Sequence, residues 1–423
     1  MAPHLPPHPA RFARPRQTLP RWFAASDEGA RSARGGQGGL SDPKPPQGEL
    51  AGSRRDADMI LRELRARGWR NLASLALRPG PGATVLFGRN GQGKTNILEA
   101  AYTALCFRSF RTSSLSDLVA WGSQGASVEA EITVGGIDRV LKIQISQGHK
   151  STSLDGKAVR RDASALLGVG AVLFAPEDLR LPKAAAAERR RFLDRAVFGG
   201  YRPYFREALT FERVLKSRNA LLRGGPVEAT LLASYDEKLA EAGARIVIRR
   251  REMVGSLMPR LEATFRRIHS AAGVGMRYRS DPRVEAAENE GEVTVALREG
   301  LAAHRETDQR RGFTGFGPQT DDLELDLAGH LAREHASQGQ LRSLVLALKL
   351  AELEHLREVL GEAPLLLLDD VASELDEERR RSLFEAMAAL SCQSLITVTE
   401  RDDLPPLPGR VDYEVSGGKL RRL

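Results

Sequence analysis

An eight-residue glycine-rich stretch constrains the fold more than any other feature of this chain. It follows a short apolar strand expected at residues 83–87 and leads directly into a helix expected at residues 95–105. A strand, a turn of this kind and a helix together match the phosphate-binding loop, in which backbone N–H groups and a helix N-terminus surround phosphate oxygens. We therefore expect the stretch to bind a nucleotide through Gly88, Arg89, Asn90, Gly91, Gln92, Gly93, Lys94 and Thr95.

The loop pattern assigns chemistry to its last two residues and requires a partner elsewhere. Lys94 supplies a point charge for the outer phosphates, and the Thr95 hydroxyl is a ligand for Mg²⁺. Residues 365–368 are four leucines, typical of a buried strand, and Asp369 and Asp370 follow at its carboxyl end. We expect Asp369 to hold Mg²⁺ and Asp370 to polarise the attacking water, which gives ATP and Mg²⁺ as cofactors.

A third motif stands directly before a helix expected at residues 341–360. Ser337, Gly339 and Gln340 form a Ser-x-Gly-Gln turn, in which a hydroxyl, a flexible backbone N–H and the helix dipole can bind an anion. Alone the turn is only a good helix cap. The order of loop, turn and apolar-Asp-Asp strand raises it to a candidate site, with Ser337 expected to be catalytic.

The rest of the chain divides by pattern into an α/β domain with a helical insertion. Paired strands are expected at residues 59–64 and 72–77, and further strands at 127–134, 139–145 and 171–174. Helical periodicity covers residues 204–222, 229–248 and 250–269. Then come a strand at 323–327, a strand at 364–369, a helix at 377–390, a strand at 394–399 and a hairpin at 411–420. We expect a first half at 59–183, a helical lobe at 184–310 and a second half at 311–423.

Residues 1–58 differ from everything that follows. They contain nine of the 22 prolines, a glycine-rich patch and no periodic apolar pattern, a composition that favours disorder. Met59 stands directly before the first expected strand, so two interpretations remain open: a disordered basic tail, or an extension that is not translated. Nine basic and six acidic residues give it a net charge of +3 out of +8, which leaves +5 for residues 59–423.

Composition excludes some classes of protein and favours others. No run approaches the ~20 apolar residues that a membrane-spanning helix requires. Two cysteines, Cys106 and Cys392, are too few for a disulfide framework and are expected to be small core residues of a cytoplasmic protein. The net charge of +8 favours an anionic partner such as nucleic acid, although a modest basic excess alone is weak support.

The three motifs in this order resemble the ATPase head of ABC-type proteins. That resemblance implies that Ser337 of one subunit meets the γ-phosphate bound by Lys94 of another, so that ATP closes a homodimer. Lys94 and Ser337 lie 243 residues apart, too far for a transporter subunit and too close for the long coiled coils of SMC and Rad50 proteins.

The remaining match is to the RecF family of bacterial DNA repair proteins, and it covers nearly all of residues 59–423. Several short strings carry this resemblance: Arg70-Asn71, residues 96–100, 108–112, 174–179, 188–194, 215–219, 336–340 and 369–376. Resemblance to this family implies ATP-dependent binding to gapped or junction DNA, and also to single-stranded DNA, together with slow DNA-stimulated ATP hydrolysis. It further implies action with RecO and RecR in loading RecA, in support of the SOS response.

The chain departs from the family at one place. Gln319 and Thr320 stand where the family has a His-Arg pair.

Several arginines are candidates for DNA contact. The clusters at 189–191, 249–251, 310–311 and 379–381 are more typical of solvated helix faces than of phosphate contacts, and Arg189–Arg191 can instead pair with nearby carboxylates. Arg108 and Arg111 are better candidates for nucleotide or DNA contact. Glu177 is in a plausible position for the family's Q-loop residue, and Thr397 or Thr399 occupies the switch position.

Two other functions remain for comparison. A nuclease with a RecF-like head would need a further domain, and only 47 residues follow Asp376. A non-hydrolysing DNA clamp would use the head for dimerisation alone; Lys94, Asp369 and Asp370 argue against it, while the Gln319-Thr320 change favours it.

Overall fold

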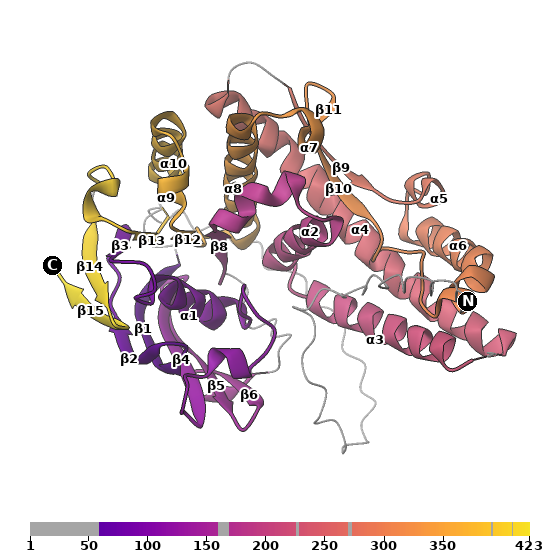
Figure 1. Ribbon diagram of the computed structural model, residues 1–423, viewed down its shortest axis with the longest axis horizontal. Coiled ribbons are helices and arrows are strands. Elements are labelled where there is room, and N and C mark those ends of the chain that lie inside the picture. Colours follow the sequence, from indigo (N-terminus) through magenta and orange to yellow (C-terminus); the bar gives the residue numbers. More distant parts are fainter. Residues whose placement is uncertain (1–58, 160–168, 226–227, 270–272, 391, 408) are drawn as a thin grey trace, which may run out of the picture.

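A computed structural model describes residues 59–159, 169–225, 228–269, 273–390, 392–407 and 409–423. The segment 1–58, for which we considered disorder or absence, lies outside the described residues. The described part is built from two six-stranded sheets, a small three-stranded sheet and a group of helices that reaches away from the larger sheets (Figure 1).

The first large sheet is antiparallel throughout and has one solvent-exposed face. Its strands run in the order β2-β1-β4-β5-β6-β7, and β1 pairs with β2 as predicted. Alternate residues of β4 are buried, which is the pattern of a sheet with one face in the core. Strands β6 and β7, at the end of the sheet beyond β5, were not predicted. The bounds are β1 Ile60–Trp69, β2 Leu72–Leu77, β4 Gly125–Val134, β5 Ile137–Ser146, β6 His149–Leu154 and β7 Lys157–Ala158.

The second sheet is parallel except for one edge strand, and both of its faces are covered. Its order is β15-β14-β3-β13-β12-β8. In β12 the leucines alternate between two cores, with Leu365 and Leu367 on one side and Leu366 and Leu368 on the other. Most of the predicted strand bounds are confirmed to within a residue or two: β3 Ala83–Phe87, β8 Ala171–Phe174, β12 Leu365–Asp369, β13 Ser394–Val398, β14 Val411–Ser416 and β15 Lys419–Arg422.

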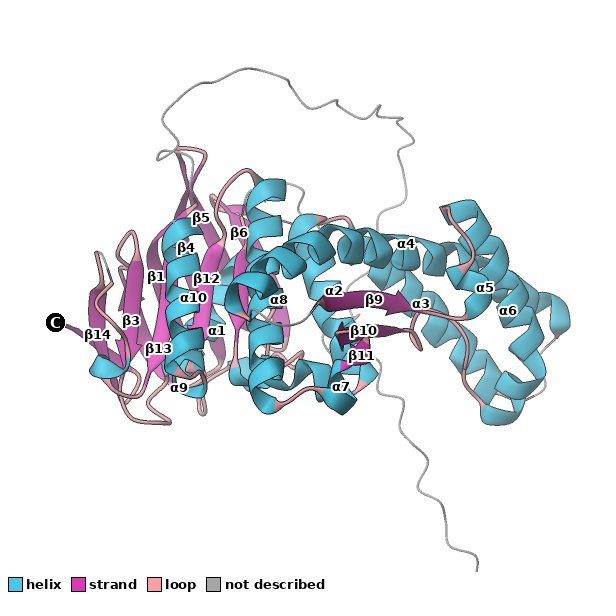
Figure 2. Ribbon diagram, turned by 90° about the horizontal axis from the view of Figure 1, so that it is seen from above, coloured by secondary structure: helices cyan, strands magenta, loops and turns pink. Residues whose placement is uncertain are grey.

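Helices fill the space between the large sheets and cover the far face of the second. Helix α1 (Lys94–Cys106) is almost wholly buried and shares one core with both sheets. Helices α8 (Gln338–Leu360) and α10 (Glu377–Leu390), with the short α9 (Val371–Glu374) between them, lie on the other face of the parallel sheet (Figure 2). The order of layers is therefore sheet, helix, sheet, helices, and α1 is held rigidly in the middle.

The middle of the chain forms a lobe around one long helix. We predicted separate helices at 229–248 and 250–269, and this is wrong: α4 runs unbroken through Ala229–Ile268, with Pro259 inside it. Neither glycine nor proline separates the two segments, so nothing ends the first helix. Other helices of the lobe are α2 Ala186–Gly200, α3 Tyr204–Arg223, α5 Pro282–Glu285, α6 Glu290–Arg311 and α7 Ala332–His335.

The strand predicted at 323–327 does not join the parallel sheet. It is β10 (Asp322–Leu327), and it pairs with β9 (Val274–Arg279) and β11 (His330–Leu331) in a three-stranded sheet. Strand β9 was not predicted, although Val274, Met276 and Tyr278 alternate along it with Gly275 and two arginines. The chain thus returns to the parallel sheet at β12, later than we expected.

The structure also bears on two expectations drawn from composition, one about the cysteines and one about membrane-spanning helices. Both cysteines, Cys106 and Cys392, are buried, as expected of small core residues. Among the helices in the described ranges, none combines the length and the apolar character needed to cross a bilayer.

Candidate nucleotide site

Four segments that carry predicted functional residues converge at the carboxyl edge of the parallel sheet. The glycine-rich loop follows β3, Asp369 and Asp370 stand at the end of β12, and Thr397 lies near the end of β13, which separates β3 from β12. Glu177 follows the edge strand β8. Because parallel strands end at the same edge of the sheet, residues about 300 positions apart in the sequence meet at one place, where ligands of such sheets bind.

Two glycines of the loop are required by close packing as well as by backbone angle. A Cβ at Gly88, whose φ is +148°, would lie 2.4 Å from the Val415 carbonyl oxygen of β14. At Gly93, whose φ is +112°, it would lie 2.9 Å from Asn71 Oδ1. Any other residue would push the loop away from its neighbours. The loop is therefore seated against the C-terminal hairpin on one side and the β1–β2 turn on the other.

Lys94 points back over the loop in which it stands. Its Nζ donates to the Gly88 carbonyl and, at 3.3 Å, to the Arg89 carbonyl. Burial lowers the pKa of Lys94, while the charges of Asp370 and Asp369 oppose that shift. The Lys94 ammonium group now donates to neutral carbonyl oxygens. Phosphate oxygens carry charge and would be stronger acceptors, so the group is suited to exchange the carbonyls for a bound phosphate.

The two predicted metal ligands are neighbours. Thr95 Oγ1 donates to Asp369 Oδ1 at 2.9 Å, and the Thr397 hydroxyl lies at the same distance from that oxygen. Neighbouring ligands of an octahedral Mg²⁺ with bonds of 2.0–2.1 Å lie about 3 Å apart, so the Thr95 and Asp369 oxygens already have the required spacing. A hydroxyl and a carboxylate are also the donor types that Mg²⁺ takes in phosphate-binding loops. These residues fit the metal.

The two aspartates differ in environment. Burial raises the pKa of Asp369, hydrogen bonds from Thr95 and Thr397 oppose the rise, and the charges of Glu177 and Asp370 add to it. Asp370 has a φ of +54°, and its N–H donates to Thr397 Oγ1 at 2.9 Å. Aspartate tolerates this left-handed conformation better than most residues, and the turn takes the chain out of the strand between the two carboxylates.

A cavity of about 300 Å³ opens over the loop and gathers most of the predicted residues. It includes two side chains whose part in it was not predicted by the loop pattern, Asn96 and Arg111. Arg111 Nη1 donates to Asn96 Oδ1 at 2.8 Å, and Asn96 Nδ2 donates to Asn71 Oδ1 at 2.8 Å. The other lining residues are Asn90, Gly91, Gly93, Lys94, Thr95, Asp369, Asp370 and Thr397.

Arg111 reaches the cavity because a buried glutamate fixes the segment before it. Glu99 of α1 is fully buried and forms a bidentate ion pair with Arg70, at 2.7 and 2.8 Å. Ser109 also donates to Glu99 and accepts the backbone N–H groups of Arg111 and Thr112. Three of the strings that signalled the family in the sequence therefore form one structural unit beside the nucleotide site.

Ser337 and its turn are not among the residues that line this cavity. Ser337 Oγ accepts the Gln340 N–H at 3.2 Å, and Gln340 Oε1 accepts the Ser337 N–H at 2.8 Å, a reciprocal cap on α8. Arg379 of α10 lies against this first turn, where a Cβ on Gly339 would be 3.0 Å from its Nη2. Its Nε donates to Ser343 at 2.7 Å, and it also pairs with Asp376.

The structure gives further contacts for several of the residues that we singled out, and it overturns one expectation about the arginine clusters. Gln92 Oε1 accepts the Gly417 N–H at 2.7 Å, so this glutamine ties the loop to the C-terminal hairpin. Arg108 does not line the nucleotide cavity as Arg111 does; its guanidinium lies 4.4 Å from the centroid of the Phe198 ring. Arg189 and Arg250 are not on solvated helix faces. They are buried and form bidentate ion pairs with Asp322 and Asp194, which confirms the predicted carboxylate pairing for Arg189.

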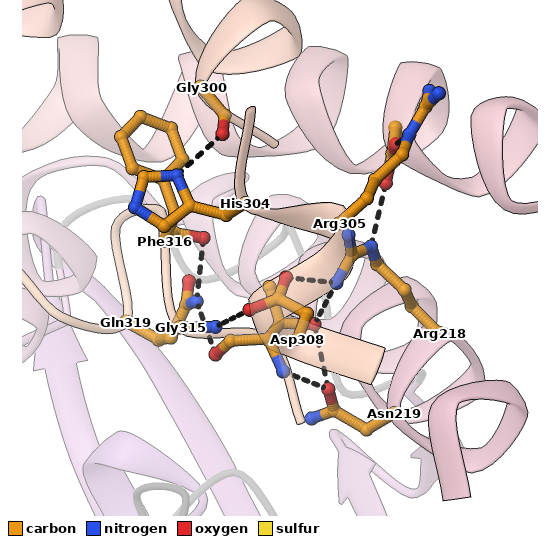
Figure 3. A network of polar contacts seen from close by, with 11 residues as sticks. Arg218, Asn219, Gly300, His304, Arg305, Asp308, Gly315, Phe316 and Gln319 are labelled. Atoms are coloured by element: carbon orange, nitrogen blue, oxygen red, sulfur yellow. Dashed lines mark hydrogen bonds and ion pairs between the residues drawn. The ribbon is translucent and has the colours of Figure 1, made fainter. Parts of the chain in front are cut away.

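The segment that departs from the family pattern is folded into the lobe (Figure 3). Gln319 Nε2 donates to the Phe316 carbonyl at 2.9 Å, so the side chain braces its own loop. The loop is held further by Asp308, which accepts the Gly315 N–H at 2.9 Å, and by Asn219, which accepts from Thr314. Gln319 therefore has a structural role in the position where a basic residue was expected.

A parallel sheet with this loop, two aspartates and a separate Ser-x-Gly-Gln helix cap defines an ABC-type ATPase head. The family model described as RecF/RecN/SMC N terminal domain matches residues 60–405. A solved Smc head domain with an extended coiled coil, from Pyrococcus furiosus, covers 86% of this chain and 96% of its own with a TM-score of 0.51 and 15% identity. That likeness concerns the fold.

Within this class the chain belongs to the RecF family. It is 44% identical over 372 residues to the DNA replication and repair protein RecF of Anaeromyxobacter sp. (strain K), matching 86% of this chain and all of the relative. The RecF of Myxococcus xanthus is 42% identical over 346 residues. A solved structure of the recombination mediator protein RecF with ATP, in the RecFOR pathway, covers 86% of this chain with a TM-score of 0.80 and 30% identity.

Proposed function

We propose that this chain is an ATP-dependent DNA-binding protein of replication and recombinational repair. In this proposal it dimerises around ATP on gapped or single-/double-strand junction DNA and acts with RecO and RecR to load RecA, supporting SOS induction. The main support for this proposal is the cavity in which Lys94, Thr95, Asp369 and Asp370 meet. The chain also belongs to a family in which a solved relative holds ATP.

Each residue has a defined part in this proposal. Lys94 leaves the Gly88 carbonyl and pairs with the outer phosphates, while the loop N–H groups and the N-terminus of α1 hold the others. Thr95 and Asp369 hold Mg²⁺, which would neutralise phosphate charge when bound. Asp370 orients and polarises the attacking water, and Arg111 with Asn96 binds the nucleotide at the mouth of the cavity.

Ser337 completes the site from a second copy of the chain. In one copy its turn lies outside the nucleotide cavity, and its backbone N–H groups form a helix N-terminus suited to an anion. Gly339 and Gln340 belong to the same cap, and Arg379 couples this cap to Asp376. Contact of this turn with the γ-phosphate would make ATP the link between two subunits, and hydrolysis would release it. Turnover is expected to be slow.

The test of this function is sedimentation with and without ATP and gapped DNA. Lys94→Ala removes the cation that the cavity places next to Asp369 and Asp370, so we expect neither ATP binding nor an ATP-dependent dimer. Lys216→Ala on the exposed side of α3 is the matched control, and it should dimerise like the unaltered chain. A Lys94→Ala chain that still dimerises with ATP would contradict the loop assignment.

A further inference from the structure

The solvent-exposed face of the antiparallel sheet changes character along its strands. In its middle, cationic and acidic side chains from neighbouring strands neutralise each other. Arg65 pairs with Glu63 at 2.7 Å, Glu129 at 3.1 Å and Glu131 at 2.6 Å, and Lys142 pairs with Glu129 at 3.3 Å. This part of the face has little charge left for a partner.

The next row of side chains on this face, two residues further along the strands, contains no carboxylate. Arg67 stands opposite Ser127 of β4, Ser127 opposite Gln144 of β5, and Gln144 opposite Ser151 of β6, so the four form a row across the sheet. The row forms one side of an open hollow of about 700 Å³, and among the residues described by the structure no aspartate or glutamate lines it. The hollow's other residues are Gly68, Ala73, Ser123, Gln124, Gly125, Ala126, Ile145, Ser146, His149 and Lys150.

One cation of this hollow is available to a negative partner. The Arg67 side chain is exposed and makes no hydrogen bond or ion pair with any part of the chain that the structure describes. Lys150, a second cationic residue of the lining, donates to the Phe107 carbonyl. Guanidinium, ammonium, hydroxyl and amide groups together are the donors that contact phosphate oxygens and sugars in nucleic-acid complexes.

A fully exposed tryptophan, Trp121, stands two residues before Ser123, which lines the same hollow. Trp121 occupies a turn closed by the Ser123 N–H, which donates to the Ala120 carbonyl at 3.0 Å. The Ala120 N–H donates to the Gly68 carbonyl at 2.8 Å, so the turn is fixed to the residue after Arg67. The indole is therefore held on an ordered turn with its whole surface in water, although burial of such a ring is strongly favourable.

We propose that the hollow and Trp121 form a DNA contact that recognises the junction between paired and single strands. Phosphates lie against the row that begins at Arg67, and the indole stacks on the first base that has lost its partner. Each base stacked on an aromatic ring contributes ~1–3 kcal/mol, and every base has a face that can stack. Inside a duplex the bases are already stacked on one another, so a single tryptophan favours the junction.

The charge of the surface decides between DNA and a protein as its partner. An exposed tryptophan would also suit a protein interface. Protein surfaces carry both signs of charge, whereas the hollow offers cations and neutral donors with no carboxylate among its lining residues. That one-sided charge complements a phosphate backbone. Only 5% of the residues are aromatic, which disfavours a platform of several stacking rings but is compatible with one ring that stacks on one base.

The experiment measures binding of the full chain, with ATP and Mg²⁺, to a labelled junction DNA and to a blunt duplex of equal length. Trp121→Ala should weaken junction binding about tenfold or more and leave duplex binding within about twofold. Trp121→Phe should restore most of the preference for the junction.

Arg67→Ala should weaken binding to both the junction and the duplex, and it should lower the slope of affinity against salt by about one phosphate contact. In a Trp22→Phe chain, junction DNA should quench the exposed Trp121 but not the buried Trp69.

Matched controls lie on the same sheet, away from the hollow. Ile137→Ala removes an exposed apolar side chain at the start of β5, and Arg139→Ala removes an exposed cation that is paired with Asp155. Both should bind DNA normally. This proposal rests on the proposed function, and the two can fail separately. An unaltered chain that binds no DNA overturns both. Trp121→Ala with unchanged junction preference overturns the site alone, as does a loss of RecO or RecR binding with DNA binding intact.

Discussion

At the scale of single residues, the backbone conformation of Asp370 separates two carboxylates that are adjacent in the sequence. Asp369 ends β12 with its side chain hydrogen-bonded to Thr95 and Thr397, and Asp370 turns into the left-handed region and lines the cavity. From the Asp-Asp pair in the sequence we predicted two roles, a metal ligand and a water-activating group. The turn at the end of β12 places the two carboxylates in different surroundings. The sequence could not predict the neighbouring Thr397 contacts, because they depend on a strand 28 residues away.

Asp370→Asn tests the role of the second carboxylate without disturbing the backbone. Asparagine also tolerates the left-handed conformation, so the substitution removes the charge and keeps the turn. We expect ATP binding and dimerisation to persist while hydrolysis slows by about 10²-fold or more, which would prolong residence on DNA. Phosphate release and DNA dissociation rates measure this. Asp138→Asn, an exposed aspartate of β5 on the antiparallel sheet, is the matched control, and wild-type turnover in Asp370→Asn would exclude Asp370 as the water-activating group.

At the scale of elements, the parallel strands and their helices were predictable because each carries a local signal. β12 is a continuous apolar run, and α1 begins at the glycine-rich loop. The lobe was harder, since its order depends on contacts between distant helices. Arg218 of α3 is fully buried and binds Asp236 of α4 at 2.7 Å and Asp308 of α6 at 2.8 Å (Figure 3). No local sequence pattern predicts such a cluster, because in the sequence its charged residues look like those of any solvent-exposed helix surface.

Arg218→Met should destabilise the lobe strongly. The substitution leaves Asp236 and Asp308 buried with one cation fewer, although Arg305 still pairs with Asp236 at 2.6 Å. Breaking a buried pair in this way costs about 3–5 kcal/mol. Denaturant unfolding followed by circular dichroism measures the loss. The control is Arg298→Ala, which breaks an exposed pair with Glu237 and should cost less than ~1 kcal/mol. Equal losses in the two variants would show that the buried cluster carries no special stability.

At the scale of the whole molecule, the nucleotide cavity and the Ser337 turn are separate features of one chain. The family resemblance predicted that they meet only between copies. Each is already formed alone: the cavity by the ends of β3, β12 and β13, and the turn by its reciprocal cap with Gln340. Nothing local needs to refold for two chains to close around ATP, so dimerisation is expected to be a rigid-body event.

Ser337→Arg tests this closure directly. A long cation at the cap would occupy the space that the γ-phosphate of the partner's ATP requires, while the cavity of the same chain remains intact. We expect one ATP bound per monomer and no ATP-dependent dimer in sedimentation. Loss of the cap itself costs about 0.5–2 kcal/mol, so a control must separate that effect. Asn289→Arg makes the same change at the cap of α6, where Asn289 Oδ1 accepts the Glu292 N–H at 3.0 Å. That variant should dimerise normally, and a normal ATP-bound dimer of Ser337→Arg would refute the contact between subunits.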